Sequence, residues 1–194
     1  TKRGDQVTVK VAISHVSVEG ARKNLQAEVP HWDFDKVKND ARESWNEELK
    51  KVAVKTNDEA QKEIFYTALY RSLLSQYTGQ DVDGQYMGMD HKIHKAQNYS
   101  FFTSFSCWDT YRSQHPLLAL VAPQHVNDFV KSIGAKTQEF GWLPAQHFRN
   151  TYRPSMVGDH LIPVVVDAYF KGYRDWDIEA LYAAMRRKAN RKSV

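Results

Sequence analysis

The sequence lacks the features that define several large classes of protein. Cys107 is the only cysteine among 194 residues, so no disulfide can form within the chain. No apolar run approaches the length of a membrane span. The glycine-rich phosphate loop, the dinucleotide-binding glycine pattern and the G-x-S-x-G nucleophile motif do not occur. These absences argue against a disulfide-stapled fold, a membrane-spanning helix, and nucleotide or serine-hydrolase chemistry built on those motifs.

Outside the C-terminal tail the chain has no net positive charge. The formal net charge at pH 7 is +4, but residues 186–192 contain five basic side chains. Without these five the chain carries −1, so its basic character belongs to the tail. A nucleic-acid-binding domain usually gathers its basic residues on one face. We therefore expect no nucleic-acid partner. The hydrophobic content of 42% is sufficient for a globular core.

Residues 6–18 show the alternation typical of a half-buried strand. Every second position holds a branched aliphatic residue, namely Val7, Val9, Val11 and Ile13. A single strand is not stable in water without partner strands. Residues 18–29 predict a short helix or turn instead of a second strand. We therefore expect the partner strands to lie outside this sequence, and the chain to be a fragment of a longer protein.

Helical periodicity dominates the rest of the chain. Asp33 is a suitable N-cap, and apolar residues follow it at spacings of three and four. A second helical pattern begins at Thr56 or Asn57. Short links between the elements favour antiparallel helix pairs. Further helices are predicted at 109–121, 124–139, 158–171 and 177–190, where Pro163 is expected to start or kink the third of these.

Residues 80–103 break the helical pattern. Asp83-Gly84 is a hairpin-turn signal between short β-prone pieces. His91 and His94 are close enough in sequence to suggest a metal site, but side chains at this spacing in an extended stretch point to opposite faces. The acidic residues of 81–90 do not have the spacing of a calcium-binding loop. The segment therefore predicts a small β element without a metal site.

The segment 104–118, SFSCWDTYRSQHPLL, gathers residue types that often bind ligands. Asp109 is suited to cap a helix or to lie in its first turn, and Trp108 is suited to pack into the core beside it. The same pair could instead line a place where a ligand binds. Cys107 is expected to be buried among apolar neighbours, where a thiol is unreactive. Spacing alone leaves both interpretations of Trp108 and Asp109 open.

Six blocks of the sequence carry a resemblance to a known family. They are FYTALYRSLLSQ (65–76), DVDGQYMGMD (81–90), FSCWDTYRSQHPLLALVAP (105–123), VNDFVKSI (126–133), LPAQ (143–146) and MVGDHLIPVVVDAYFKG (156–172). Their order resembles that of glycoside hydrolase family 92, the calcium-dependent, exo-acting α-mannosidases of bacteria. Residues 13–49 also resemble that family's passage from an N-terminal β-sandwich into its catalytic domain.

The resemblance implies both an architecture and a function. The fold class expected is mainly α, a partial (α/α)6 barrel of helical hairpins with a small β element and a remnant strand of a β-sandwich. Residues 1–30 would end the sandwich, residues 31–55 would form a linker helix, and residues 56–194 would begin the catalytic domain. The implied activity is removal of terminal, α-1,2-linked mannose from glycans by calcium-dependent inverting hydrolysis, in the periplasm or outside the cell.

The family also gives Trp108 and Asp109 a role, because they resemble the wall that holds the terminal mannose. An aspartate can accept hydrogen bonds from two sugar hydroxyls, and a tryptophan can stack on a pyranose face. The family's EGN, GND and HES motifs, which carry the general acid, the general base and a calcium-associated element, do not occur in this sequence. No catalytic residue or calcium ligand is therefore assigned to it, and we expect both downstream in a parent protein, leaving this chain inactive by itself.

The sequence departs from the family pattern at two places, and the second departure favours an alternative function. Gln146 stands where many members have tryptophan, and Tyr152-Arg153 stands where they have Glu-Thr. The alternative is a non-catalytic carbohydrate-binding module or a structural helical module. Uncovered apolar faces of an incomplete barrel would also favour self-association.

Overall fold

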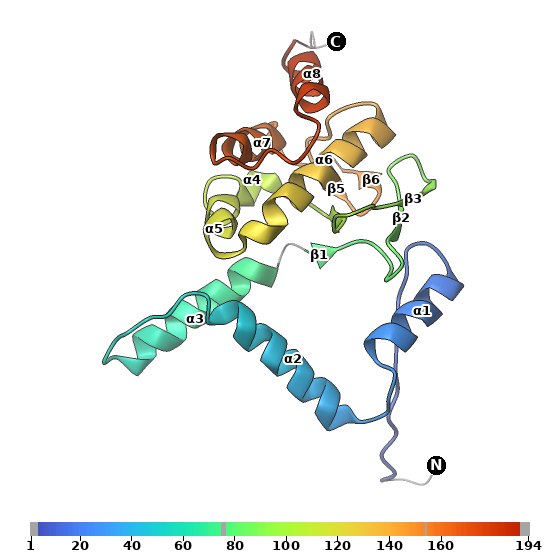
Figure 1. Ribbon diagram of the computed structural model, residues 1–194, viewed down its shortest axis with the longest axis vertical. Helices are drawn as coiled ribbons and strands as arrows, with labels where there is room; N and C mark the ends of the chain where they lie inside the picture. The colour runs from blue at the N-terminus through green and yellow to red at the C-terminus, as the bar shows by residue number, and fades with distance from the viewer. Residues whose placement is uncertain (1–3, 75–76, 154, 191–194) are drawn as a thin grey trace.

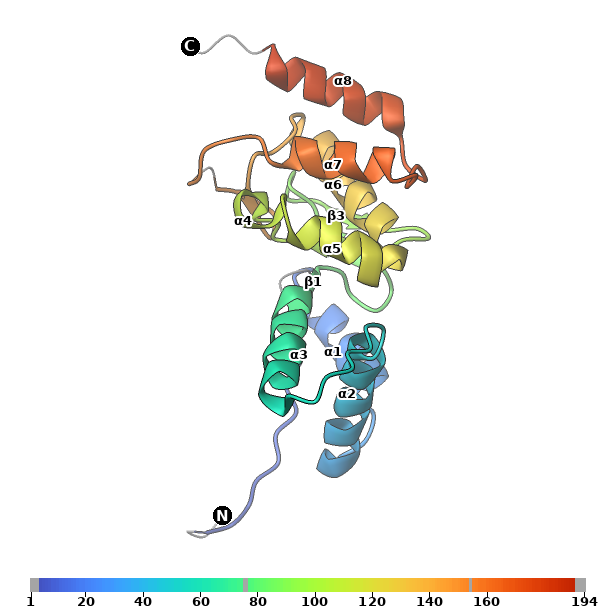
Figure 2. The same cartoon turned by 90° about the vertical axis from the view of Figure 1, so that its left-hand side faces the viewer.

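The computed structural model describes residues 4–74, 77–153 and 155–190, and it is predominantly helical (Figure 1). Helices α1, α2 and α3 lie at the end of the molecule nearer the N-terminus, and the later helices are stacked at the other end (Figure 2). Two basic residues of the tail, Arg191 and Lys192, lie outside the described residues. The helices are α1 (Val18–Glu28), α2 (Phe34–Leu49), α3 (Glu59–Leu74), α4 (Cys107–Thr110), α5 (Gln114–Val121), η1 (Pro123–His125), α6 (Val126–Phe140), α7 (Leu161–Phe170) and α8 (Ile178–Ala189).

The strand predicted for residues 6–18 does not form. Residues 5–14 have no regular secondary structure, and α1 begins at Val18. The four aliphatic side chains of the alternating pattern are between 65% and 81% exposed. The physical reason is the lack of a partner. A single strand is not stable in water, and no described strand pairs with this segment. The short helix expected in residues 18–29 is confirmed as α1.

Helices α2 and α3 contact each other, and their starts are set by aspartates. Asp33 Oδ1 accepts a hydrogen bond from the Lys36 backbone N–H at 2.9 Å, which confirms the predicted N-cap. The third helix begins at Glu59, slightly later than predicted, because Asp58 Oδ1 accepts bonds from the first free backbone N–H groups. Trp45 and Tyr70 join the two helices, with ring centroids 4.5 Å apart.

The core lies between α5, α6, α7 and α8. Helix α6 contributes the fully buried Ile133 together with Phe129 and Val130, and α7 contributes the fully buried Val165. Pro163 falls in the first turn of α7, where a missing N–H costs no hydrogen bond, so it marks the start of the helix. None of the helices in the described ranges combines the length and the apolar character needed to cross a lipid bilayer.

The small β element consists of short antiparallel pairs. The strands are β1 (Tyr77–Thr78) with β4 (Phe102–Thr103), β2 (Gln85–Met87) with β3 (Ile93–Lys95), and β5 (His147–Phe148) with β6 (Thr151–Tyr152). The Asp83-Gly84 turn is confirmed, with Gly84 at φ +82°, but it connects only a single bridge between Gln80 and Tyr86. The longer hairpin, β2–β3, turns over residues 88–92 instead.

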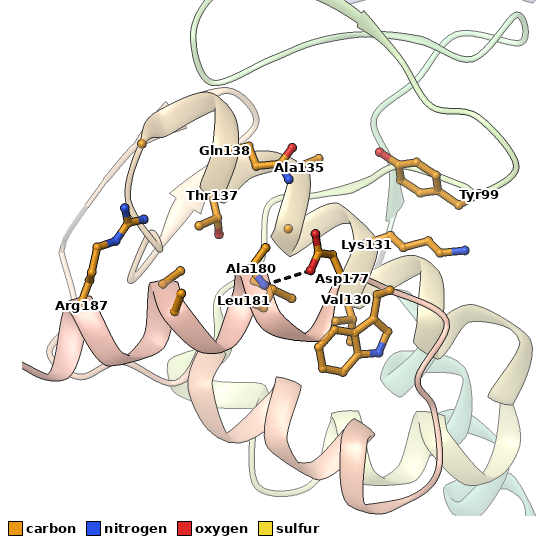
Figure 3. A pocket seen from close by; sticks show the side chains of 15 residues that line it. Tyr99, Val130, Lys131, Ala135, Thr137, Gln138, Asp177, Ala180, Leu181 and Arg187 are labelled. Carbon is orange, nitrogen blue, oxygen red and sulfur yellow. Dashed lines mark hydrogen bonds between the residues drawn. The ribbon is translucent and has the colours of Figure 1, made fainter.

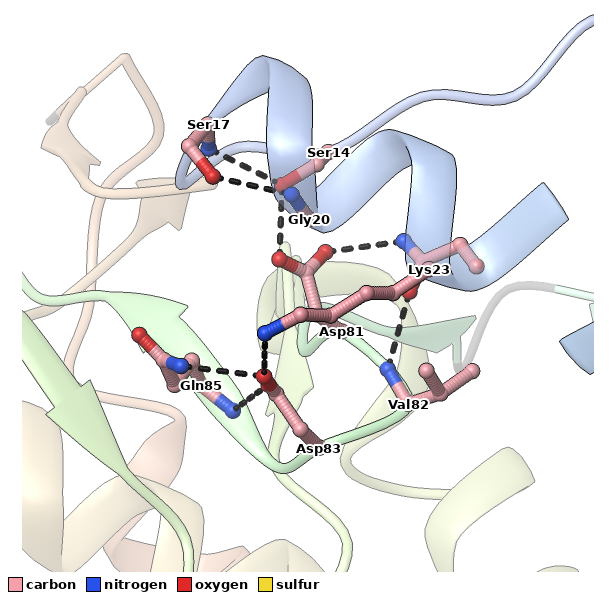
Figure 4. A network of polar contacts seen from close by, with 9 residues as sticks. Ser14, Ser17, Gly20, Lys23, Asp81, Val82, Asp83 and Gln85 are labelled. Atoms are coloured by element: carbon pink, nitrogen blue, oxygen red, sulfur yellow. Dashed lines mark hydrogen bonds and ion pairs between the residues drawn. The ribbon is translucent and has the colours of Figure 1, made fainter. Parts of the chain in front are cut away.

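A buried polar network joins the N-terminal segment to this β element (Figure 4). Asp81 is 4% exposed and accepts hydrogen bonds from Ser14 Oγ at 2.7 Å and from Asn24 Nδ2 at 2.8 Å. Gly20 faces the same carboxylate so closely that a Cβ there would lie 2.1 Å from Asp81 Oδ2. Lys23 closes the edge of the network through an ion pair with Asp83. The network fixes α1 against the turn that follows β1.

Candidate functional site

Trp108 and Asp109 lie in α4, a helix of only four residues whose position is fixed by the core. Phe105 and Cys107, on the N-terminal side of the pair, are each 1% exposed. Trp108 is 39% exposed, and Asp109 is also exposed. A helix this short is not stable by itself. The buried neighbours therefore hold the backbone while the two candidate side chains face solvent.

The Trp108 indole is supported by His160, the residue before α7. The two ring centroids are 5.5 Å apart and the planes are nearly perpendicular, while Tyr111 packs on the same imidazole at 4.5 Å. Gly158 allows this arrangement because it has φ +94° and a Cβ there would lie 2.3 Å from His160 Cε1. His160 is not among the candidate residues predicted from the sequence, although it lies within one of the six family blocks.

Asp109 is in the first turn of α4, as one of the two sequence-based interpretations expected. Its carboxylate accepts a hydrogen bond from Ser106 Oγ at 3.2 Å, and no described arginine pairs with it. Ser106 Oγ in turn accepts a hydrogen bond from Gln146 Nε2 at 3.2 Å. Gln146, predicted only as a departure from the family pattern, therefore takes part in the polar contacts around Asp109.

The second departure, Tyr152-Arg153, is partly explained by packing. The Tyr152 ring lies 5.1 Å from the Phe140 ring at the end of α6. The Arg153 side chain is exposed, and its backbone N–H donates to the Gln146 carbonyl oxygen at 3.3 Å. This pair closes the β5–β6 hairpin beside Gln146.

Cys107 and His115 lie together, with Sγ and Nε2 3.7 Å apart, as in a nucleophile–base pair. Burial raises the pKa of the Cys107 thiol to about 12 and lowers the pKa of His115 to about 4. Near neutral pH the thiol is therefore protonated and the imidazole is uncharged, and this pair does not supply a thiolate. The prediction that Cys107 is buried is confirmed.

Lys136 is a charged residue that the sequence analysis did not expect in the core. It is fully buried in α6, donates a hydrogen bond to the Phe102 carbonyl oxygen, and lies 4.0 Å from the Phe101 ring. Burial lowers its pKa to about 7, and Glu139 opposes that shift. Nearby His147 is 2% exposed, and its Nδ1 has no partner among the described residues. Burial lowers the pKa of His147 well below its ordinary value, and the nearby Lys136 charge adds a smaller contribution in the same direction.

The described residues do not fit a calcium site. No group of three or more His, Cys, Asp or Glu side chains within residues 4–74, 77–153 and 155–190 is arranged to hold a metal ion. Asp81 already accepts bonds from Ser14 and Asn24. His94 is hydrogen-bonded to Asp90 at 2.9 Å, and His91 lies 3.3 Å from Asn150. The two histidines therefore have different partners.

A hollow of about 660 Å³ lies between α6 and α8 (Figure 3). Small residues such as Gly134, Ala180 and Ala184 line much of it, and Lys131 and Arg187 lie along its sides. Asp177, in the same wall, caps α8 by accepting a hydrogen bond from the Ala180 N–H. The hollow shares no residue with the candidate site.

The sequence of residues 20–194 matches the family model described as the glycosyl hydrolase family 92 catalytic domain. The chain belongs to glycoside hydrolase family 92. This confirms the resemblance noted in the sequence, and a mainly helical structure with short strands agrees with the predicted partial helical barrel. Family 92 members among the solved structures include α-mannosidases.

One solved relative is a family 92 α-mannosidase of Bacteroides thetaiotaomicron, 34% identical, with a TM-score of 0.87 over 93% of this chain and 24% of that one. It is also known in complex with mannoimidazole. A second is an inverting family 92 mannosidase of the same species, 30% identical, with a TM-score of 0.84 over 93% of this chain and 25% of that one. An uncharacterised secreted glycosidase of Arthroderma benhamiae is 28% identical over 89% of this chain and 19% of its own length. The chain thus spans about a quarter or less of these relatives.

Proposed function

We propose that this chain forms part of the mannose-binding wall of a bacterial exo-α-mannosidase that is secreted or periplasmic. Residues 1–30, 31–55 and 56–194 correspond in this proposal to the end of a β-sandwich, a linker helix and the beginning of an (α/α)6 catalytic domain. The observation that carries it is the exposed Trp108-Asp109 pair on a backbone anchored by buried neighbours. The indole would stack on the terminal mannose, and the carboxylate would accept hydrogen bonds from its hydroxyls.

The proposed reaction is inverting hydrolysis of terminal α-1,2-linked mannose. Inversion requires one carboxylic acid and one carboxylate on opposite sides of the sugar, separated widely enough for a water molecule. We assign neither role to this chain, and we place the calcium ligands of the enzyme outside its described residues. What this chain contributes is the position and orientation of the sugar.

The test is hydrolysis of an aryl α-mannoside by the full-length gene product that contains this chain. Asp109→Asn is expected to lower kcat/KM by about 10- to 100-fold, the loss of a hydrogen bond to a charged group. The thermal midpoint should not change, because Asp109 is exposed and bonds only to Ser106 among the described side chains. Asp35→Asn, in the exposed first turn of α2, is the control. Unchanged kinetics of Asp109→Asn would exclude the substrate role.

Further measurements extend this test to the finer proposals. The first anomer released, observed by proton NMR, should be inverted, and mannobiose with an α-1,2 linkage should be cleaved faster than its α-1,3 isomer. Chelation should abolish turnover and calcium should restore it. The 194-residue chain alone should show no turnover, and its sedimentation should reveal association through its exposed aliphatic side chains.

The alternative, a carbohydrate-binding module without turnover, is favoured by one observation. Tyr152 packs on Phe140 and Arg153 is exposed, so the pair that replaces Glu-Thr offers no carboxylate. A full-length protein that binds mannose, loses affinity in Asp109→Asn and hydrolyses no α-mannoside would support this alternative.

A further inference from the structure

Gln146 connects Ser106, the N-cap of the helix α4 that carries Asp109, to the segment that follows the β5–β6 hairpin. Its Nε2 donates to Ser106 Oγ at 3.2 Å, and Ser106 Oγ donates to Asp109 Oδ2 at 3.2 Å. Its Oε1 accepts from Ser155 Oγ at 2.9 Å and from the Met156 backbone N–H at 3.3 Å. The carboxamide therefore bridges two segments about 50 residues apart in sequence.

The neighbours of this carboxamide fix which way it points. A backbone N–H can only donate, so the Gln146 atom beside the Met156 N–H must be the oxygen. The amide nitrogen must then face Ser106. Because this nitrogen can only donate, the Ser106 hydroxyl accepts from Gln146 and turns its single proton toward Asp109.

The two residues of the central hydrogen bond, Ser106 and Gln146, both lie next to buried residues. Ser106 lies between the buried residues Phe105 and Cys107. Gln146 precedes His147, which is 2% exposed and whose Nε2 lies 3.5 Å from the Phe105 N–H. The hydrogen bonds therefore do not depend on a mobile surface loop to bring Gln146 and Ser106 together.

We propose that Gln146 is a positioning residue for sugar binding by Asp109. By fixing the Ser106 hydroxyl as a donor to Oδ2, it holds the carboxylate in one orientation and leaves Oδ1 to accept a hydrogen bond from a mannose hydroxyl. Oδ1 makes no hydrogen bond with the residues that the structure describes. This inference rests on the proposed function.

The decisive variant is Gln146→Glu in the full-length gene product. Glutamate has nearly the same shape and keeps an oxygen for Ser155 and Met156, but it cannot donate to Ser106. Its second oxygen would compete with Asp109 for the single Ser106 proton. We expect kcat/KM for an aryl α-mannoside to fall about tenfold through a higher KM, as one lost hydrogen bond predicts, at an unchanged thermal midpoint. In a Ser106→Ala background the same substitution should cost less than about twofold, because no hydroxyl remains to be turned.

Gln146→Met separates positioning from simple bracing of the hairpin, because it keeps the bulk and removes every side-chain hydrogen bond. Bracing alone predicts that Gln146→Met loses activity while Gln146→Glu does not, and that result would overturn the inference. An equal cost of Gln146→Glu with and without Ser106 would also overturn it. If Asp109→Asn itself leaves the kinetics unchanged, the proposed function fails. If Asp109→Asn lowers activity and Gln146→Glu does not, only the present inference fails.

Discussion

Replacing Lys136 with methionine is expected to remove a large part of the pH dependence of folding stability. The ammonium group is fully buried in α6, where it donates to the Phe102 carbonyl oxygen and lies 4.0 Å and 5.1 Å from the rings of Phe101 and Phe105. These contacts do not replace its hydration, so burial lowers the pKa of Lys136 from 10.5 to about 7. Between these two pH values the unfolded chain binds a proton that the folded chain has released.

The sign of the effect follows from proton linkage. Because the unfolded state holds more protons from about pH 7 to 10.5, the free energy of unfolding rises with pH in that window. Where the unfolded state holds one full proton more than the folded state, the free energy of unfolding changes by about 1.4 kcal/mol per pH unit. Since Lys136 is half protonated in the folded state near pH 7, the gain from pH 7.0 to 8.5 is about 1.5 kcal/mol. Cys107, whose thiol pKa is raised from 9.0 to about 12, opposes this only at higher pH.

The assay is urea unfolding of the chain at half-unit steps from pH 7.0 to 8.5. The wild type should gain about 1.5 kcal/mol over this range, whereas Lys136→Met should stay nearly flat. Lys38→Met, at an exposed position of α2, should behave as the wild type. A flat wild-type profile, or the same slope in Lys136→Met, would refute the assignment of a buried, nearly neutral lysine.

Three further predictions concern groups away from the candidate sugar site. Gly20→Ala should lower the free energy of unfolding by about 1–3 kcal/mol because its Cβ would displace the Asp81 carboxylate, while Gly134→Ala, whose Cβ meets only ordinary contacts, should be neutral or stabilising in urea titrations. Cys107 should resist a disulfide reagent at pH 8 until urea unfolds the chain; immediate labelling would contradict its burial. The pKa of His115, lowered to about 4, predicts that stability is lost as pH falls from 6.5 toward 4, by up to about 1.4 kcal/mol per unit, and His115→Gln should lessen the loss.

The helices could be predicted because their signals are local. Asp33 caps α2 with its own side chain, and the spacing of apolar residues is preserved in α6 and α8. The N-terminal strand could not be predicted correctly from the same kind of signal. The alternation in residues 6–18 indicates which side chains prefer burial. A strand also needs hydrogen-bonding partners, and no described strand supplies them.

Lys136 shows a different limit of sequence reasoning. It lies three residues after Ile133 and seven after Phe129, so helical periodicity places it on the buried face of α6. A lysine on such a stripe is usually interpreted as a residue at its edge, because its long stem can carry the ammonium group to water. In this fold Phe101 and Phe105, from a segment about 30 residues earlier, cover that route. Only the tertiary arrangement shows that the charge is enclosed.

The candidate site likewise depends on contacts between segments that are distant in the sequence. The family resemblance indicates Trp108 and Asp109, yet residues that contact them or their neighbours come from other parts of the chain. His160 supports the indole from the start of α7, and Gln146 reaches Ser106 from the segment before β5. A single glutamine after Leu-Pro has no local pattern that would identify it as a partner of an aspartate about 40 residues earlier. Since α4 is only one turn long, the geometry of Asp109 depends on these distant contacts more than on its own helix. The proposed function therefore predicts that substitution of Gln146 alters sugar binding although Gln146 does not contact the sugar.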